Sequence, residues 1–273
     1  MEKVSVIIPT YNRKDKVLLS IKSVLDQSYD NLEIIVVDDC STDGTEEVLK
    51  NINDTRVVYH RLSHNQGAAH ARNYGVMNAN SEIVAFNDTG DKWSRDKLKK
   101  QMKYLADNPN DVLVYCRYNR QMSEDLSITV PPIERPLNEL KGDILKYLLG
   151  SNTIGPPTLM TYKDVFLNIG GFSETYNALE DWDFAIRMAK NGNIGFIDEV
   201  LVEADYSEGG LSSQANISNY YDARCRMLAE HIKEIQQFGL FDIIVQDIFQ
   251  RADQRGILEQ VKQMLMLYIK DMM

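Results

Sequence analysis

The architecture of this chain can be inferred from one segment, Ser81-Glu82-Ile83-Val84-Ala85-Phe86-Asn87-Asp88-Thr89-Gly90-Asp91-Lys92-Trp93. It opens as a short apolar run, residues 83–86, with the length and β-branched content of a buried strand. It then changes abruptly to polar residues. Carboxylates at the end of a buried strand suit a divalent cation that carries phosphate, because hard cations take oxygen ligands. An ordinary Asp/Gly turn before a helix capped by Ser94 explains the same residues equally well.

The residues on either side of this segment alternate between strand and helix patterns. The strand-like runs are 4–8, 32–37, 56–61 and 83–86, and the helix-like runs between them are 15–27, 45–51 and 67–79. This order predicts an α/β fold whose first half is a doubly wound sheet of parallel strands.

The second half continues with mixed elements. Helices are expected at 97–106, 143–149, 164–169 and 180–191, strands at 112–118, 155–161, 193–198 and 200–205, a loop at 123–138, and helices again from 217 onward. The length allows one large α/β domain with an appendage or two modest domains.

Polar residues follow three of the predicted strands directly. They are Thr10-Tyr11-Asn12, Asp38-Asp39 and the segment 88–91. Because the carboxyl ends of parallel strands meet at one edge of the sheet, these side chains are expected to lie together, where open sheets bind ligands. Three polar strand ends therefore indicate a site more strongly than any one of them.

The composition narrows the class of protein. A net charge of −10 argues against duplex nucleic acid as the main partner and against a basic membrane-binding face. No apolar run approaches the roughly 20 residues of a membrane span. Three scattered cysteines and an N-terminus that enters a strand directly lead us to expect a reduced, cytoplasmic protein without a signal peptide. Because no G-x-x-x-x-G-K-[ST] loop is present, nucleotide binding must use another arrangement.

Six motifs, in order, give the chain a family resemblance. They are the segments 6–12, 37–43, 65–73, 88–93, 170–172 and 180–183. Together they resemble a family 2 glycosyltransferase over residues 1 to about 215. The resemblance implies a GT-A fold, which is Rossmann-like with a mixed central sheet flanked by helices, here with a C-terminal helical extension. It also implies a UDP-sugar donor bound through Mn²⁺ or Mg²⁺, and transfer that mostly inverts the anomeric centre.

The same resemblance implies an organisation and a setting. A nucleotide-binding half would cover about 1–118, an acceptor half about 119–215, and a helical region 216–273. The enzyme would transfer a hexosyl or N-acetylhexosaminyl group to a hydroxyl of a glycan, glycolipid or glycoprotein. Assembly of bacterial surface polysaccharide is the expected setting, in the cytoplasm or peripherally at the inner face of the membrane.

The resemblance also implies donor-binding roles for the residues at matching positions of this chain. These are Thr10, Tyr11, Asn12, Asp39, Arg72, Asp88 and Trp93. Tyr11 would stack on the uracil, Asp39 would accept a hydrogen bond from it, and Arg72 would lie beside the base or the diphosphate. Each has a structural alternative: a half-buried tyrosine at a strand end, a helix-capping carboxylate, and an arginine paired with Asp38 or another carboxylate.

Asp181 matches the residue that the family uses as general base, and Glu180 would orient the acceptor or support it. An inverting transfer needs one carboxylate to deprotonate the attacking hydroxyl. The alternative is an acidic first turn of a helix, which suits the helix dipole.

Two departures concern the metal. The family usually has Asp-x-Asp-Asp where this chain has Asp88-Thr89-Gly90-Asp91, and many members have a histidine near the segment 206–212, which has none. Three interpretations remain. Asp88 and Asp91 hold the cation together, transfer proceeds without metal with Arg72 or Lys92 offsetting charge, or the chain is a non-catalytic binding relative.

The region after 215 lies outside the resemblance. Its apolar residues recur at helical spacing, which predicts two or three helices. They either pack on the catalytic domain or form an apolar seam for self-association or domain docking.

Overall fold

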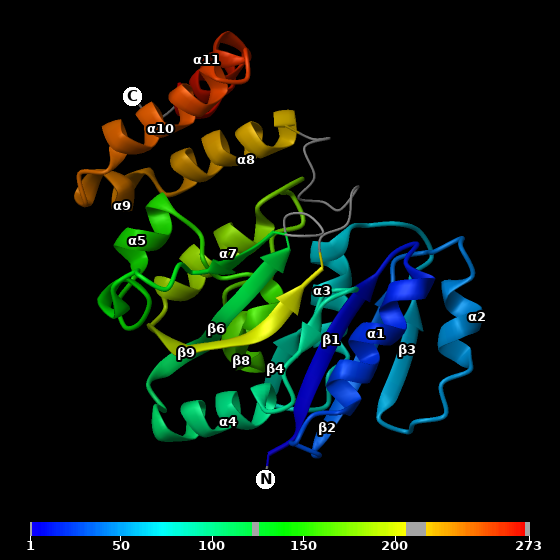
Figure 1. Cartoon of the computed structure of the whole chain (residues 1–273). Helices are drawn as coiled ribbons and strands as arrows, with labels where there is room; N and C mark the ends of the chain where they lie inside the picture. Colours follow the sequence, from blue (N-terminus) through cyan, green and yellow to red (C-terminus); the bar gives the residue numbers. More distant parts are fainter. Residues whose placement is uncertain (1, 122–125, 206–216, 271–273) are drawn as a thin grey trace.

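In the computed structural model, which describes residues 2–121, 126–205 and 217–270, nine strands form one sheet (Figure 1). The strands are β1 (Val4–Thr10), β2 (Leu32–Asp38), β3 (Val57–Arg61), β4 (Ile83–Phe86), β5 (Lys92–Trp93), β6 (Asp111–Gln121), β7 (Ser127–Val130), β8 (Met160–Tyr162) and β9 (Asn193–Ala204). The helices are α1 (Lys14–Leu25), α2 (Thr45–Lys50), α3 (Ala68–Met77), α4 (Lys97–Asp107), α5 (Leu145–Gly150), α6 (Lys163–Asn168), α7 (Glu180–Ala189), α8 (Ile217–Glu230), α9 (Ile232–Gln237), α10 (Phe241–Asp253) and α11 (Leu258–Ile269). Short 3-10 helices cover Leu137–Glu139 and Pro156–Thr158.

The first half of the sheet is parallel, as predicted. The spatial order β3-β2-β1-β4 places β1 between β2 and β4, and each neighbouring pair is parallel. β1 and β2 are buried along their whole length because their mainly apolar residues are covered on both faces. The register sets Thr10 opposite Asp38. The carboxyl ends of these strands therefore form one edge.

The second half makes the sheet mixed, in agreement with the expected fold class. β8 pairs antiparallel with β4 and β6, whereas β6 pairs parallel with β9. Four local predictions differ from the structure. Residues 156–158, expected in a strand, form a 3-10 helix before β8, and the described C-terminal region has four helices where two or three were expected. Residues 127–130 were expected in a loop, but they form β7 because they pair with the end of β6. Residues 193–204 form one strand instead of two, because register shifts around Cys116 and Arg117 let β9 stay paired past its polar middle.

Helices cover both faces of the sheet. One apolar cluster joins α1 and α4 to the first face through residues such as Val17 and Leu98. A second cluster joins α3, α6 and α7 to the opposite face and includes Phe166 and Phe184. The molecule is thus a three-layer α/β/α arrangement, with α1 in front of β1 and β2 in Figure 1.

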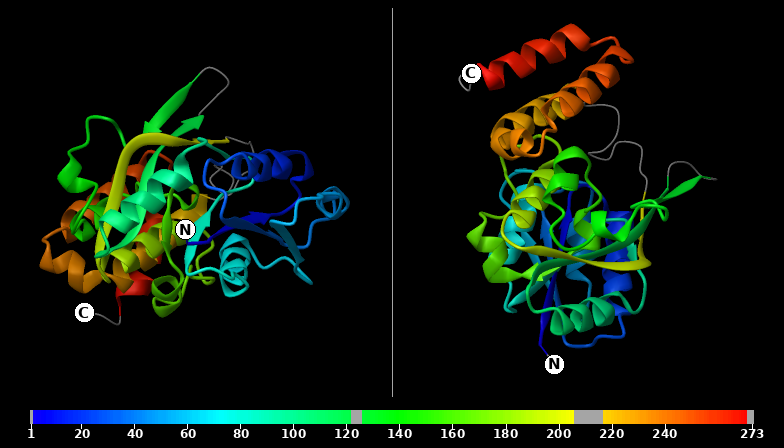
Figure 2. Two further views of the ribbon diagram at one scale, coloured as in Figure 1. Left: turned by 90° about the horizontal axis from the view of Figure 1, so that it is seen from below. Right: turned by 90° about the vertical axis from the view of Figure 1, so that its left-hand side faces the viewer.

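The C-terminal helices α8–α11 pack on the rest of the chain. Tyr221, Ile244 and Leu265 belong to the same apolar cluster as Phe184 of α7. The right-hand view of Figure 2 shows these helices gathered at the end of the molecule opposite the N-terminus. In the described ranges, no helix has the length and apolar character needed to cross a membrane. Self-association through these helices stays a prediction.

Candidate active site

Polar residues at the carboxyl ends of the parallel strands lie side by side. Asp39 donates its backbone N–H to the carbonyl of Thr10 at 2.9 Å, which ties the end of β2 to the end of β1. Thr89, after β4, donates its hydroxyl to the carbonyl of Pro9 at 2.7 Å. The three strand ends that the sequence placed at one edge therefore meet there, where open α/β sheets bind ligands.

The loop after β1 is bonded to the loop after β2. Ser41 Oγ accepts the N–H of Asn12 at 2.8 Å, and Asn12 Oδ1 accepts the N–H of Thr42 at 2.8 Å. Asn12 and Cys40 both have left-handed backbones, with φ of 51° and 66°. Such conformations persist at sites where surrounding contacts hold them. Tyr11 is left 45% exposed beside this rigid turn, so its ring is available for stacking.

Asp39 is buried and caps the approach to α3. Its carboxylate accepts the N–H groups of Gln66 at 2.8 Å and Gly67 at 2.7 Å. This is the structural alternative that the sequence left open. Each carboxylate oxygen has a second lone pair, so Asp39 can accept a further hydrogen bond. Its contact with a base stays a prediction.

Arg72 of α3 bridges two carboxylates in the interior of the site. Its side chain is 5% exposed. Nη2 donates to Asp88 Oδ1 at 2.8 Å and Nη1 donates to Glu180 Oε1 at 3.0 Å. Burial alone lowers the pKa of Arg72, but the charges of Asp88 and Glu180 raise it above its ordinary value. The arginine is thus a fixed cation between the loop after β4 and the start of α7, and Asp38 is not its partner.

Asp181 lies in the first turn of α7 beside this cluster. Its Oδ1 accepts the N–H of Trp182 at 2.8 Å, and its Oδ2 accepts the side-chain amide of Asn152 at 3.2 Å. Burial, followed by the charge of Glu180, raises the pKa of Asp181 from 3.8 to about 7, while Arg72 acts in the opposite direction. A carboxyl group that titrates near neutral pH is well suited to take a proton.

Some buried polar atoms have no hydrogen-bond partner. Among the described residues they are Thr10 Oγ1, both amide atoms of Asn87, Arg72 Nε, Trp93 Nε1, Arg187 Nη2 and His231 Nε2. Leaving such a group unpaired costs on the order of 1–3 kcal/mol. Proteins carry this cost where a ligand or ordered water supplies the missing partner. The atoms of Thr10 and Asn87, at the ends of β1 and β4, are therefore available to a ligand at this edge of the sheet.

The surroundings of Gly90 explain why no carboxylate stands there. Gly90 has a φ of +107°, and a Cβ at this position would lie 2.8 Å from Asp205 Oδ2. Asp205 directly follows β9, forms an ion pair with Lys16 of α1 and donates its N–H to Asp91 Oδ1 at 2.8 Å. The Asp205 carboxylate thus takes up the space that a side chain at position 90 would need.

Asp88 and Asp91 are the two carboxylates that the sequence proposed as cation ligands, and this role stays a prediction. Burial and the charge of Asp88 raise the pKa of Asp91 well above its ordinary value. In the part of the chain that the structure describes, no three His, Cys, Asp or Glu side chains are grouped as cation ligands. Mg²⁺ is commonly held by one or two carboxylates plus substrate phosphates, so this pair fits a cation that arrives with a diphosphate. The segment 206–212, which lacks the family's histidine, lies outside the described residues.

We expect Gly90→Ala to destabilise the fold more than Gly142→Ala. Both glycines have positive φ, +107° and +84°, so both variants carry a backbone penalty of about 1–2 kcal/mol. Only at position 90 does the new Cβ meet another side chain. In urea, the free energy of unfolding of Gly90→Ala should be lower by about 1 kcal/mol or more than that of Gly142→Ala. Equal losses would show that Asp205 moves aside freely.

Some residues near the site carry no sequence signal. Ser20 of α1 donates its hydroxyl to the carbonyl of Asp88 at 3.1 Å and accepts the N–H of Gly90 at 2.8 Å. Burial raises the pKa of Tyr118 in β6 to about 12, and the nearby charge of Asp181 adds to the rise. Both are ordinary helix and strand residues in the sequence, because only the tertiary fold brings them to the site.

Trp93, which the resemblance placed in the donor site, is a buried residue of β5. Its backbone pairs with Val202, and its side chain is 6% exposed. The ammonium group of Lys97 lies 3.8 Å from its ring centroid, and burial lowers the pKa of this lysine to about 8. The ring already faces a cation, and its contact with a donor stays a prediction.

Comparison with known families gives one match over more than half of the chain. Glycosyl transferase family 2 matches residues 5–165. The matched range contains Thr10, Asp39, Arg72 and Asp88 and ends before Asp181.

Two curated relatives match parts of the chain. TuaG of Bacillus subtilis, a glycosyltransferase named for teichuronic acid biosynthesis, is 46% identical over 106 residues, which are 38% of this chain and 42% of TuaG. WfaP of Escherichia coli, a UDP-Glc:alpha-D-GlcNAc-diphosphoundecaprenol beta-1,3-glucosyltransferase, is 35% identical over 129 residues, 47% of this chain and 50% of WfaP. Each match thus spans half or less of the relative's length.

A solved structure shares the fold. Residues 1–349 of S. aureus TarS, crystallised in complex with UDP-GlcNAc, align with a TM-score of 0.68 at 20% identity, over 97% of this chain and 84% of that chain. At this identity the likeness concerns the fold alone. The expected GT-A architecture, with its mixed sheet and C-terminal helices, is confirmed.

Proposed function

The chain belongs to glycosyl transferase family 2, and we propose that it transfers a sugar from a UDP-sugar to a hydroxyl of a glycan, glycolipid or glycoprotein, with inversion. The observation that carries this proposal is the environment of Asp181. A carboxyl group whose pKa is raised to about 7 lies next to Glu180, which Arg72 joins to Asp88. This combination offers a base beside a fixed cation, at the edge where the nucleotide is expected.

In the proposed reaction, Asp181 takes the proton of the acceptor hydroxyl as that oxygen attacks the anomeric carbon. A carbon–oxygen bond forms on one face of the sugar. The bond from the anomeric carbon to the diphosphate oxygen breaks on the opposite face, and UDP leaves with the bonding electrons. One carboxylate suffices because the leaving group needs its charge offset and does not need a proton. The amide of Asn152 holds one oxygen of Asp181 and thereby orients the group.

Donor binding is proposed for the nucleotide edge of the sheet. Tyr11 would stack on uracil, and Asp39 would accept a hydrogen bond from it. WfaP is named for UDP-Glc as its donor, and TarS was crystallised in complex with UDP-GlcNAc, which supports this donor class. Asp88 and Asp91 would hold Mn²⁺ or Mg²⁺, which would offset the charge that develops on the departing diphosphate.

The acceptor and the setting are proposed from the relatives. TuaG is named for teichuronic acid biosynthesis, and WfaP for GlcNAc-diphosphoundecaprenol as its acceptor. We assign residues 1–118 to the nucleotide half, 119–215 to the acceptor half and 216–273 to a helical region that completes the enzyme. The corresponding role here is assembly of surface polysaccharide at the cytoplasmic side of the membrane.

A second candidate is a binding subunit without catalysis. Gly90 favours it, because the position usually credited with the metal has no side chain. Asp205 offers a steric reason for the glycine that does not require loss of activity. The cluster of Arg72, Asp88 and Glu180 favours the transferase.

Calorimetric titration of UDP into the protein tests the donor site. We expect micromolar binding that weakens about tenfold or more when EDTA replaces Mn²⁺. Equal affinity in EDTA would mean that Arg72 and its neighbours offset the diphosphate charge alone. Absence of binding in both conditions would contradict the UDP-site assignment.

A further inference from the structure

Helix α8 contacts the segment that carries Asp181, although α8 lies beyond the range of the family match. Arg224 belongs to α8, and His231 directly follows the end of this helix. Because the two residues are separated by seven positions, they lie on the same face, about two helical turns from each other. Their exposed fractions are only 3% and 4%. They meet Trp182 and Asp183, which directly follow Asp181.

Arg224 stacks on the indole ring of Trp182. Its guanidinium carbon lies 4.0 Å from the ring centroid, where the ring quadrupole attracts a cation. Burial lowers the pKa of Arg224, so this arginine is held in an environment that disfavours its charge. On the other side, Trp182 donates its Nε1–H to the carbonyl of Leu148 in α5 at 2.6 Å. The ring is therefore fixed between two helices.

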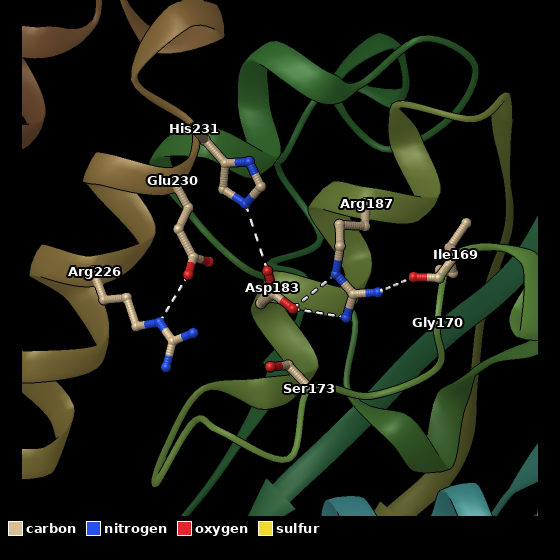
Figure 3. Close-up of a pocket in the computed structure, with 8 residues that line it drawn as sticks. All are labelled: Ile169, Gly170, Ser173, Asp183, Arg187, Arg226, Glu230 and His231. Carbon is tan, nitrogen blue, oxygen red and sulfur yellow. Dashed lines mark hydrogen bonds and ion pairs between the residues drawn. The ribbon is translucent and has the colours of Figure 1, made fainter. Parts of the chain in front are cut away.

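His231 faces Asp183, and Figure 3 shows this contact together with the contact between Asp183 and Arg187. Lys190 Nζ lies 3.3 Å from His231 Nδ1. An ammonium group only donates, so Nδ1 is the acceptor in this contact. Nε2 lies 3.5 Å from Asp183 Oδ1, and Arg187 donates to the other oxygen at 2.8 Å. Burial would raise the pKa of Asp183, but these donors lower it below its ordinary value.

The segment before the proposed base is held by the same helix. Arg226 donates to the carbonyl of Thr175 at 3.0 Å, and Glu230 accepts the hydroxyl of Tyr176 at 2.7 Å. Next to the base-bearing turn, Leu179 has a left-handed φ of 62°. A residue with a side chain keeps this conformation only where its surroundings enforce it. A cleft of about 300 Å³ remains between α7 and α8 (Figure 3).

We propose that Arg224 and His231 are positioning residues, which fix the direction of the Asp181 carboxyl group through Trp182 and Asp183. Their contacts with these two residues are called the α8 clasp below. The proposal rests on the function proposed above, because it takes Asp181 as the base. It makes the C-terminal helices part of the catalytic unit, whereas the sequence placed them outside the resemblance.

The clasp should act on catalysis and not on donor binding. Tyr11 and Asp39 lie at the nucleotide edge, on loops that follow β1 and β2. The clasp holds α7, which presents Asp181. Misplacing a catalytic group by about 1 Å can lower a rate by about 10²-fold. Loss of the clasp is therefore expected to lower kcat while the affinity for UDP is kept.

Variants of the full chain test this expectation. We expect Arg224→Met and His231→Ala each to lower kcat by about 10–100-fold, with the Kd for UDP changed by less than about twofold. Arg224→Lys keeps a cation over the ring, and His231→Gln keeps a side chain that accepts and donates, so both should recover most of the loss. Arg251→Met is the control. It removes an exposed arginine of α10 that pairs with Asp247, and it should change neither quantity.

The pH profile supplies a readout that plain destabilisation would not move. Without the clasp, Asp181 becomes better solvated, so the inflection in kcat/KM should shift below the value of about 7 expected for the intact enzyme. Glu180, Arg72 and Asp88, the other charges that act on Asp181, are unchanged in these variants.

Two results would overturn the proposal. One is an unchanged kcat in folded Arg224→Met and His231→Ala. The other is a parallel loss of UDP affinity, since the contacts would then only hold the fold together. If Arg224→Met does not fold, Arg224→Gln keeps a polar side chain without the cation and is judged by the same criteria. A wild-type protein that releases no UDP from any donor would instead contradict the proposed function, so the two failures are distinguishable.

Discussion

Asp181→Asn should lower kcat by about 10²–10⁴-fold while leaving the fold and the affinity for UDP in place. The amide keeps the size of the carboxyl group and can still accept the N–H of Trp182, but it cannot take a proton from the acceptor. Turnover and UDP titration on the same preparation measure the two quantities. Asp164→Asn is a matched control, because Asp164 also accepts the N–H of the next residue at the start of a helix, away from the site. A twofold loss or less in Asp181→Asn would remove it as the base.

The same carboxyl group fixes the pH dependence of turnover. A general base works only when it is ionised, so kcat/KM should fall as the pH drops below about 7 and should level off above it. The direction follows from burial and the charge of Glu180, which both favour the protonated form of Asp181. An inflection near pH 4, the ordinary value for an aspartic acid, would contradict this environment.

Arg72→Met should lower the free energy of unfolding by about 1.5–3 kcal/mol, because it removes a buried guanidinium that donates charge-assisted hydrogen bonds to Asp88 and Glu180. Arg56→Met is the matched control. Arg56 pairs with Asp54 on the surface, with side chains 33% and 30% exposed, so its loss should cost only about 0–1 kcal/mol. Urea unfolding of both variants measures the difference. Equal losses would mean that Arg72 is no more than a peripheral ion pair.

Turnover should also suffer in Arg72→Met. Arg72 lowers the pKa of Asp181, so without it the base would be protonated to a higher pH. The pH inflection of any residual activity should therefore move above about 7, the direction opposite to that expected for loss of the α8 clasp. The direction in which the pH inflection moves therefore distinguishes Arg72→Met from the variants that lose the α8 clasp.

Gly90 illustrates how the structure changes the meaning of a sequence departure. From the sequence, a glycine at the usual metal position left three interpretations, ranked with a rearranged cation site first, metal-free transfer second and a silent relative third. In the structure, Asp205 fills the space beside this glycine and bonds Asp91 through its backbone. An aspartate at position 90 would have a strained backbone, because φ is positive there, and its side chain would meet Asp205. Replacing Gly90 by Asp would therefore do more than restore a metal ligand.

The parallel half of the fold was predictable because its signals are local. Apolar runs define β1, β2 and β4, and polar residues such as Thr10 and Asp88 follow them directly. The antiparallel half was less predictable. β7 is a four-residue strand whose pairing with β6 decides its state, and β9 is continuous only because register shifts absorb its polar middle.

The sequence motifs named residues of the candidate site but did not reveal the contacts between them. The motifs nominated Arg72, Asp88 and Glu180, but nothing in their spacing says that one guanidinium bridges two carboxylates 108 and 16 residues away. Asp205 and Arg224 carried no motif, since their roles depend on contacts between distant elements. Such contacts leave no periodicity in the sequence, so only the fold reveals them.

Release of UDP from UDP-hexoses and UDP-N-acetylhexosamines is the most direct test of the proposed transfer. The assay uses the full chain with Mn²⁺, a lipid-diphosphate-linked sugar as acceptor, and Asp181→Asn beside the wild type. We expect the wild type to release UDP from at least one donor, and only when the acceptor is present. Asp181→Asn should release UDP at a rate that is lower by about 10²-fold or more. A wild-type protein that binds UDP but releases none from any donor, or a variant that matches the wild type, would contradict a transferase with Asp181 as its base.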